Sequence, residues 1–492
     1  MFDEAWYLER YPDVAALKMD PIKHFLWIGA KIGRSPSIDF DTNSYLVEYD
    51  DVTQAGVNPL LHYLKWGKSE GRTAFAIERH CNEATSVASD KGRSVAGAFE
   101  QKNDCPLVVY ESHNLKMQGA PNSLFEIAVG VSRRGRFQVA VSSNTSGPLL
   151  SLYEENGISK LIHSISQNKM KDDRKRDEWI ARLSHHYRDL GAGIVHVNTL
   201  QNFHAVIAAK KAGCSVVWNI RESEDPETYY DYLPEPARAM AYSAFGKADI
   251  CVFVAHATRK LWQNFLGEHL NAATVHNGIN MDRLMTPVYG TNRALLRAKY
   301  QVEKADTVIL SVGTVCERKG QIDLLRAIEL FEPAQLARTI VAVVGFNDTT
   351  YSKDVRRGFE DLRQHGIRLI AVDETQTEEQ RRILSELYLC ADVFAFCSRM
   401  ESYPRVIMEA LEFGLPIVST PCFGVVEQLV EGSSGLFYSQ GDVQVLAERL
   451  LQLCGNFDMR RSMSRAARKR LQELNSYERM IEAYESIYAD LL

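Results

Sequence analysis

The sequence predicts an α/β protein in which two doubly wound sheets of parallel strands follow one another, preceded by a small helical repeat module. A chain of 492 residues is too long for one hydrophobic core, since single cores stop growing at about 250–300 residues. Apolar, β-branched runs alternate with amphipathic segments in two successive series, a pattern typical of parallel strands joined by crossover helices. The N-terminal region repeats itself, which indicates a separate module.

The N-terminal module, residues 1–75, contains two copies of one unit. Tyr7 recurs as Tyr45 and His24 as His62, both 38 residues later. The other shared positions are mainly aromatic residues, aspartates, prolines and glycines, in the first copy Phe2, Asp3, Leu8, Tyr11, Asp13, Val14, Pro21, Leu26, Gly29, Gly33 and Arg34. Each unit predicts two short helices divided at an Asp-Pro or Asn-Pro step, with glycines ending the second.

Neither unit alone could bury its aromatic residues, so we expect the two to stack on each other or on the main body. His24 and His62 are candidate metal ligands, but their equivalent helical positions beside aromatic residues favour a structural role. An aromatic surface of this kind suits self-association, a partner protein or a glycan chain.

Three further segments follow the module. Residues 76–104 are polar and lack apolar periodicity, which predicts a linker. The two series of strands place one domain at 105–285 and a second at 286–475, and we expect a final helix, 476–492, to pack back on the first of these domains. Because ligands of open parallel sheets bind at the carboxyl ends of the strands, two facing sheets predict a cleft between the domains.

Composition excludes several classes of protein. Apolar residues make up 45% and charged residues 24% of the chain, as in ordinary soluble proteins, and the net charge of -6 argues against nucleic acid as a partner. Nine cysteines are scattered without a CxxC pair, so no disulfide framework or zinc cluster is indicated. The N-terminus lacks the features of a secretory signal. We expect a cytoplasmic protein, with peripheral attachment at the inner face of a membrane as the alternative.

The strongest chemical motif is SRMESYPRVIMEALEFGLP, which follows an apolar strand. Pro404 suits the first helical turn, so Glu401 is expected in the loop and Glu409 well inside the helix, at the margin of its apolar face. A carboxylate at the position of Glu409 can accept both hydroxyls of a ribose. Glu401 and the backbone amides of Ser402 and Tyr403 can hold a sugar ring at the helix N-terminus. The alternative is a solvated helical glutamate and a capping carboxylate.

This segment resembles the donor-binding signature of glycosyltransferase family 4, retaining enzymes with the GT-B fold of two Rossmann-like domains facing a cleft. The resemblance implies that Glu401 contacts the transferred sugar and Glu409 the ribose. The next block, STPCFGVVEQLVEGSSGLFYSQGD, is also similar to the family, with Gly424 and Glu427 at its loop and helix start. The resemblance covers roughly residues 105–490.

Upstream, SVGTVCERKGQIDLLRAI resembles the family's diphosphate-binding segment. Lys319 matches the phosphate lysine, just before a helix whose dipole adds to its charge. The family often has an arginine directly after the glycine at position 313, where this chain has Thr314, so Arg318 would be the second cation if it turns inward. We therefore nominate Lys319, Arg318 and Glu401 as catalytic residues, with Gly313 and Thr314 as donor contacts.

In the first domain, SHNLKMQGAPNSLFEIA places Gly119 and Ala120 between a strand and a helix. This loop resembles the family's N-terminal loop, which approaches the diphosphate or the acceptor. After the strand SVVWN many members carry a histidine that faces the reacting sugar. This chain has Arg221 and Glu222 in that region, and they are the candidates on the acceptor side.

The resemblance implies a retaining hexosyltransferase that uses a nucleoside-diphosphate sugar and a glycan, lipid-linked or protein acceptor in polysaccharide or glycoconjugate assembly. It implies no cofactor and no metal, in agreement with the lack of an Asp-x-Asp motif in a strand-loop context, and it implies that the leaving phosphate takes the acceptor proton. Thr314 and the missing histidine leave open a catalytically weak GT-B scaffold protein. A sugar-nucleotide epimerase of the same fold is the other alternative.

Overall fold

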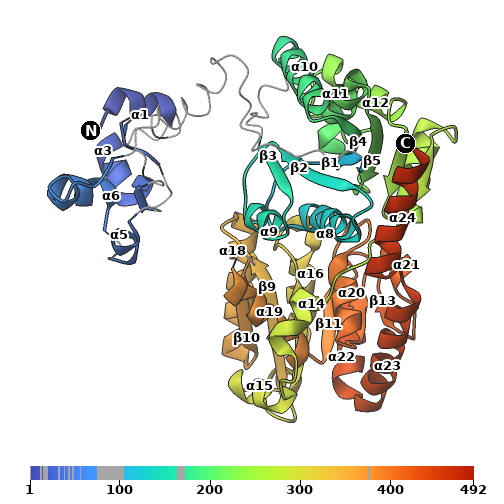
Figure 1. Ribbon diagram of the computed structural model, residues 1–492. Coiled ribbons are helices and arrows are strands. Elements are labelled where there is room, and N and C mark those ends of the chain that lie inside the picture. Colours follow the sequence, from blue (N-terminus) through green and yellow to red (C-terminus); the bar gives the residue numbers. More distant parts are fainter. Residues whose placement is uncertain are drawn as a thin grey trace. The chain divides into compact units, whose positions relative to one another are not determined.

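A computed structural model describes residues 2–11, 14, 20–30, 34–37, 39–40, 42, 45–46, 49–55, 57–74, 105–162, 172–374 and 377–492. The chain forms two compact units, Met1–Phe99 and Glu100–Leu492 (Figure 1). The linker expected at 76–104 and the repeat positions Asp13, Gly33 and Asp41 lie outside the described residues.

The first unit folds its two repeats around one aromatic core. Its helices are α1 (Glu4–Arg10), α3 (Pro21–His24), η1 (Phe25–Gly29), α5 (Asp50–Ala55), α6 (Pro59–His62) and η3 (Tyr63–Gly67). Phe25, Tyr45 and Tyr63 are buried together in the core. The side chains of Asp20 and Asn58 cap α3 and α6 at their proline starts, which explains the Asp-Pro and Asn-Pro steps of the repeat.

The histidines of the two repeats occupy the same structural position. The Tyr7 hydroxyl lies 3.0 Å from His24 Nδ1, and the Tyr45 hydroxyl lies 3.0 Å from His62 Nδ1. A Cβ on the glycine five residues after each histidine would collide with that tyrosine hydroxyl. The tyrosine, the histidine and the glycine therefore depend on one another, and the two histidines bond to separate tyrosines.

The second unit begins with a seven-stranded parallel sheet of order β3-β2-β1-β4-β5-β6-β7 (Figure 1). Its strands are β1 (Leu107–Ser112), β2 (Gln138–Ser143), β3 (Ser159–Ile162), β4 (Ala192–Asn198), β5 (Ser215–Ile220), β6 (Ile250–Phe253) and β7 (Ala272–Thr274). The connecting helices are α8 (Gly119–Arg134), α9 (Leu149–Glu155), α10 (Asp173–Asp189), η5 (Leu200–Asn202), α11 (Phe203–Ala212), α12 (Glu235–Phe245) and α13 (His256–Leu266). The strand order reverses between β1 and β4, the position at which open parallel sheets bind ligands.

A six-stranded parallel sheet of order β10-β9-β8-β11-β12-β13 forms the core of the second domain. Its strands are β8 (Thr307–Val312), β9 (Thr339–Phe346), β10 (Arg368–Asp373), β11 (Val393–Phe396), β12 (Ile417–Ser419) and β13 (Gly435–Phe437). Its helices are α14 (Asp282–Met285), η6 (Thr286–Val288), α15 (Arg293–Lys299), η7 (Glu317–Lys319), α16 (Gln321–Glu329), α17 (Pro333–Leu336), α18 (Thr350–Leu362), η8 (Arg363–His365), α19 (Glu378–Cys390), α20 (Arg405–Glu412), α21 (Val425–Gln428), α22 (Val443–Gly455) and α23 (Phe457–Glu473). The order reverses between β8 and β11, whose carboxyl ends lead into the two strongest motifs of the sequence.

The last helix, α24 (Tyr477–Asp490), packs in the core of the first domain although it follows the second (Figure 1). The Tyr488 hydroxyl donates to the Tyr110 hydroxyl at 3.2 Å and lies 2.6 Å from His196 Nδ1. The chain therefore crosses from one domain to the other twice, and both domains belong to one compact unit.

The basic residues at the carboxyl end of α8 form ion pairs with α24. Arg134 pairs with Glu485 at 2.9 Å and with Glu482 at 3.4 Å.

No helix in the described part of the chain has both the length and the apolar character that a membrane span requires.

Candidate active site

A cavity of about 670 Å³ lies between the two domains of the second unit. Segments that follow β1, β5, β8 and β11 contribute to its wall, which matches the rule that parallel sheets bind ligands at the carboxyl ends of their strands. Its wall includes twelve of the thirteen nominated residues: Gly119, Ala120, Arg221, Glu222, Gly313, Thr314, Arg318, Lys319, Glu401, Ser402, Tyr403 and Glu409. Gly424 lies outside the wall.

Glu401 holds both nominated cations. Its Oε1 atom lies 2.5 Å from Lys319 Nζ and 2.6 Å from Arg318 Nη1, and it accepts a hydrogen bond from the Ser398 hydroxyl at 3.0 Å. Burial alone would raise the pKa of Glu401, but Lys319 and Arg318 hold it below the usual value. The site therefore presents two cations and one ionised carboxylate at neutral pH, and Arg318 does turn toward the cavity.

Two glycines shape the loop that carries these cations. Gly313 has φ of 140°, and a Cβ on the neighbouring Gly345 would collide with the Gly313 carbonyl. Gly320 has φ of 65° and links η7 to α16 directly after Lys319, a conformation that glycine adopts without strain. Thr314 lies in the wall between them, in the region where the resemblance implies an arginine.

The second glutamate of the motif is fixed by a tyrosine. α20 begins at Arg405, with Pro404 as its N-cap, so the helix starts one residue later than the sequence predicts. The Tyr388 hydroxyl donates to Glu409 Oε2 at 2.9 Å. Burial raises the pKa of Glu409, and the charge of Arg405 and the bond from Tyr388 oppose that rise.

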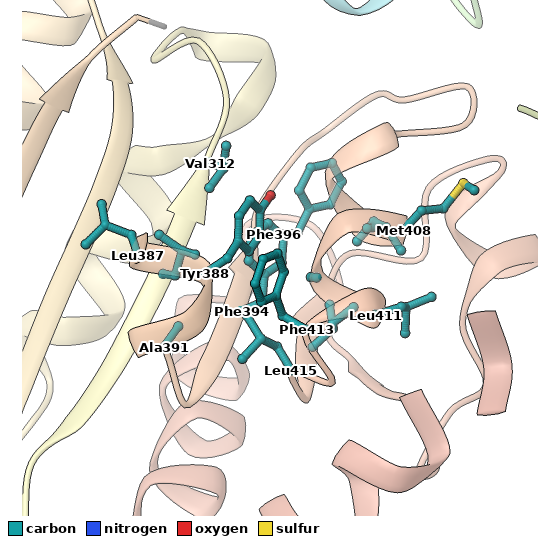
Figure 2. Close-up of a cluster of buried hydrophobic side chains, with 14 of the residues drawn as sticks. Val312, Leu387, Tyr388, Ala391, Phe394, Phe396, Met408, Leu411, Phe413 and Leu415 are labelled. Atoms are coloured by element: carbon teal, nitrogen blue, oxygen red, sulfur yellow. The ribbon is translucent and has the colours of Figure 1, made fainter. Parts of the chain in front are cut away.

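The Tyr388 ring belongs to a cluster of buried hydrophobic side chains of the second domain (Figure 2). The Tyr388 ring stacks on Phe413, with 5.2 Å between ring centroids, and on Phe394 at 5.9 Å. Stacking fixes the ring, so its hydroxyl is held toward Glu409 by packing against the core.

Ser402 and Tyr403 contact the first domain as well as the cavity. The Ser402 hydroxyl donates to the Arg221 carbonyl at 2.6 Å and lies 2.7 Å from the Ser223 hydroxyl. A Cβ on Gly424 would collide with the Ser402 carbonyl. Gly424 does not line the cavity. Its lack of a side chain allows its own loop to pack against the loop that carries Glu401.

The first domain contributes the amino end of α8. The helix starts at Gly119, so Gly119 and Ala120 form its first turn, where the sequence predicts a loop. The Ala120 carbonyl accepts a hydrogen bond from Asn198 Nδ2 at 3.2 Å. The positive end of a sixteen-residue helix therefore lies in the wall, a position that favours anions.

Arg221 and Glu222 are both held by neighbours. Arg221 donates to Asn198 Oδ1 at 2.6 Å and to Asn277 Oδ1 at 3.0 Å, while its Nη2 atom is buried without a hydrogen-bond partner. Glu222 accepts from the backbone amides of Arg221 and Leu200. Burial raises the pKa of Glu222 to about 7.

Comparison with known proteins identifies the fold. Residues 292–470 match the family model of the glycosyl transferases group 1. The crystal structure of Anabaena Alr3699/HepE in complex with UDP and glucose aligns with a TM-score of 0.63 at 17% identity, over 78% of this chain and 99% of that protein. The fold is GT-B.

The chain is also similar to curated proteins over part of their length. The chain is 30% identical to N-acetyl-alpha-D-glucosaminyl L-malate synthase of Bacillus anthracis over 246 residues, which are 50% of this chain and 61% of the relative. It is 30% identical to the amylovoran biosynthesis glycosyltransferase AmsK of Erwinia amylovora over 147 residues, which are 30% of this chain and 35% of the relative. The chain therefore spans about three fifths of the first relative and about a third of the second.

Three residues that line the GT-B cleft, Glu126, Arg405 and His113, were not nominated from the sequence. Glu126 of α8 forms a two-pronged ion pair with Arg405 of α20, with both N–O distances 2.7 Å, and both residues line the cavity. His113 follows β1 and lies 3.4 Å from the Thr199 hydroxyl; burial and the charge of Arg221 lower its pKa to about 4. Nothing in the local sequence distinguishes Glu126 from other acidic residues of amphipathic helices. His113 directly follows a buried strand, and this position could have led to its nomination.

Proposed function

We propose that this protein is a retaining glycosyltransferase that moves a hexose-type sugar from a nucleoside-diphosphate sugar to a glycan, lipid-linked or protein acceptor. The observation that carries the proposal is the cluster of Lys319, Arg318 and Glu401 in the wall of the interdomain cavity. Breaking the sugar–phosphate bond develops negative charge on the leaving diphosphate, and fixed cations stabilise that charge.

The ion pairs of Glu401 suggest how the donor is received. A diphosphate that binds Lys319 and Arg318 takes over the role that the carboxylate has in this structure. Glu401 is then released to accept hydrogen bonds from hydroxyls of the transferred sugar, and charge-assisted bonds of this type are strong. The diphosphate then supplies the negative charge beside the two cations, and Glu401 remains in the site as a carboxylate bonded to sugar hydroxyls.

Glu409 and the amino end of α8 complete the proposed donor site. Glu409 receives the two ribose hydroxyls while Tyr388 holds it in place, and the first turn of α8 faces the diphosphate or the acceptor. Arg221 and Glu222 lie on the acceptor side, where the buried Arg221 Nη2 atom has a free hydrogen-bonding position. We assign no protein nucleophile, and the leaving phosphate accepts the proton of the attacking hydroxyl. This route retains the configuration at the anomeric carbon and uses neither a cofactor nor a metal.

Relatives set the range of substrates to test. Similar solved structures hold UDP and glucose or UDP-glucose, and curated relatives act in polysaccharide synthesis by name. We therefore place this protein in polysaccharide or glycoconjugate assembly, with UDP-glucose as the first donor to test.

The experiment is donor hydrolysis by the full chain with UDP-, GDP-, dTDP- and ADP-sugars, with and without EDTA. We expect thermal stabilisation and slow hydrolysis with one donor class, both unchanged by EDTA, and NMR coupling constants of the released sugar that show its initial anomeric configuration. Binding without hydrolysis would favour the scaffold alternative. A product epimerised within the ring would favour the epimerase.

A further inference from the structure

Three metal-binding side chains meet outside the cavity, at a junction of the two domains. His256 begins α13, His276 follows β7, and Glu427 lies on α21. One ligand atom from each residue lies within 4.8 Å of the other two. His276 Nε2 is 2.8 Å from Glu427 Oε2, and the rings of His256 and His276 are 4.9 Å apart between centroids.

The donor set and its geometry fit a first-row transition metal. Two imidazoles and one carboxylate form a known set of three protein ligands for four-coordinate Zn²⁺, in which water takes the fourth position. Ligand atoms in such a site are about 3.3 Å apart, given metal–ligand distances of about 2.0–2.2 Å. His276 and Glu427 are already closer than that, and the exposed His256 side chain is free to rotate inward.

Neighbouring groups set the expected strength of this site. Glu427 accepts hydrogen bonds from the backbone amides of His256 and Ala257, so its carboxylate is held in position. The amino end of α13 and the guanidinium of Arg470, which donates to the Glu427 carbonyl, both oppose an added cation. We expect weaker binding than at a four-ligand structural zinc site.

We propose that His256, His276 and Glu427 form a binding site for Zn²⁺ or a similar divalent transition metal, which ties the two domains together. The two histidines come from the first domain and the glutamate from the second, so a bound ion adds an interdomain bond. His276 also stacks on Tyr403, with 4.8 Å between ring centroids, and the adjacent Asn277 bonds both Tyr403 and Arg221. Metal binding therefore fixes residues that line the cavity, although the ion itself is outside it.

The test is titration of the tag-free full chain, under reducing conditions, with Co²⁺ followed by visible absorption and with Zn²⁺ followed by thermal unfolding. The variant is His256→Gln, because this exposed side chain can change without loss of the amide bonds to Glu427. The control is His365→Gln, an exposed histidine on η8 in the second domain. Binding is measured directly, so the result does not depend on the proposed transferase activity.

We expect one Co²⁺ per chain with d–d absorption and no thiolate charge-transfer band, and a higher unfolding temperature with Zn²⁺. His256→Gln should weaken Co²⁺ binding more than tenfold, and His365→Gln should bind as the parent does. Failure of the parent to bind, equal binding by His256→Gln, or a thiolate band from the cysteines would each overturn the proposal.

Discussion

The two Rossmann-like domains differ in the partners of several of their ionisable groups. In the second domain, two partly buried carboxylates lie beside cations. Glu401 pairs with Lys319, and Asp392 pairs with Arg297 and Arg293 at 2.8 and 2.7 Å. Such pairs keep their charge in a buried position because each partner replaces part of the lost hydration.

In the first domain, Glu111 and His196 are instead buried beside neutral partners, although Glu485 there pairs with Arg134. Glu111 is fully buried and accepts from the Tyr187 hydroxyl at 2.8 Å, and burial raises its pKa to about 7. His196 bonds Tyr488, and burial, with the charge of Arg221, lowers its pKa to about 3. At neutral pH, His196 is therefore neutral and Glu111 is partly protonated.

This difference in pairing indicates which domain has charged side chains available for chemistry. The second domain places Lys319, Arg318 and Glu401 in the cavity wall, which is where the proposed function needs charge, whereas Glu111 and His196 of the first domain belong to a buried polar network. We therefore expect charge-removing substitutions to act on turnover in the second domain and on pH-dependent stability in the first.

The largest effect is expected for Lys319→Ala. Loss of a cation that faces the leaving diphosphate should lower donor hydrolysis about 100- to 1000-fold, and should weaken binding of a nucleoside monophosphate much less. Single-turnover hydrolysis and calorimetric titration measure the two quantities. Lys353→Ala, an exposed lysine of the same domain, is the control and should retain full activity. Equal losses in hydrolysis and monophosphate binding would make Lys319 a binding residue only.

The next effect is the pH dependence of Glu111→Gln. The folded pKa of about 7 is above the ordinary 4.5, so the folded protein binds more protons than the unfolded chain between these values. Parent stability should therefore fall as pH rises through this window, by about 3 kcal/mol at most. The amide cannot ionise, so the unfolding midpoint of the variant relative to the parent should rise between pH 5 and pH 8. A constant difference, as expected for the exposed control Glu329→Gln, would show that Glu111 is not protonated in the fold.

A smaller effect is expected for Glu409→Ala. If the carboxylate binds the ribose, its loss should weaken UDP or GDP binding about 10- to 100-fold, since hydrogen bonds to charged groups contribute about 1.5–3 kcal/mol. Calorimetric titration measures the change. Glu412→Ala on the same helix, outside the cavity wall, is the matched control. Unchanged affinity of the Glu409 variant would remove the ribose assignment.

The ion pair across the cleft should show a modest coupling. Glu126→Gln and Arg405→Gln, alone and together, form a double-mutant cycle, and we expect a coupling of about 1–2 kcal/mol in the free energy of unfolding because both side chains are mostly buried. The exposed pair of Glu379 and Arg382 serves for comparison and should give a smaller coupling, because solvent screens it. If the effects of the Glu126 and Arg405 substitutions on the free energy of unfolding are additive, this ion pair contributes nothing to domain association.

The smallest effect on chemistry is expected for deletion of residues 1–75. The nominated site lies wholly in the unit Glu100–Leu492, so donor hydrolysis should stay within a few-fold of the full chain. The module presents exposed Leu26, Leu64 and Trp66, so its loss should alter elution volume or use of a polymeric acceptor. A truncated protein that is folded by circular dichroism but inactive would show that the module takes part in chemistry.

Local patterns in the sequence were enough to predict the two sheets, and with the family resemblance they predicted most of the residues that line the cavity. Strand and helix periodicity is set by residues close in the chain, and Lys319 and Glu401 each follow a buried strand at the switch point of one sheet. Strands next to each other in a parallel sheet bring their carboxyl ends together. The meeting of these two motifs therefore follows from fold class alone.

The tertiary structure alone decided how the residues are paired. Glu126 and Arg405 are 279 positions apart, and no local period links them or joins His256 and His276 to Glu427. The pKa values of Glu111 and His113 depend on burial by segments distant in the chain. The sequence by itself determined which helices and strands form and which charged motifs follow the strands. The packing of the two domains decided which charged side chains pair and which ionisable groups become neutral. Coulomb energy and desolvation depend on distance and burial in the folded protein.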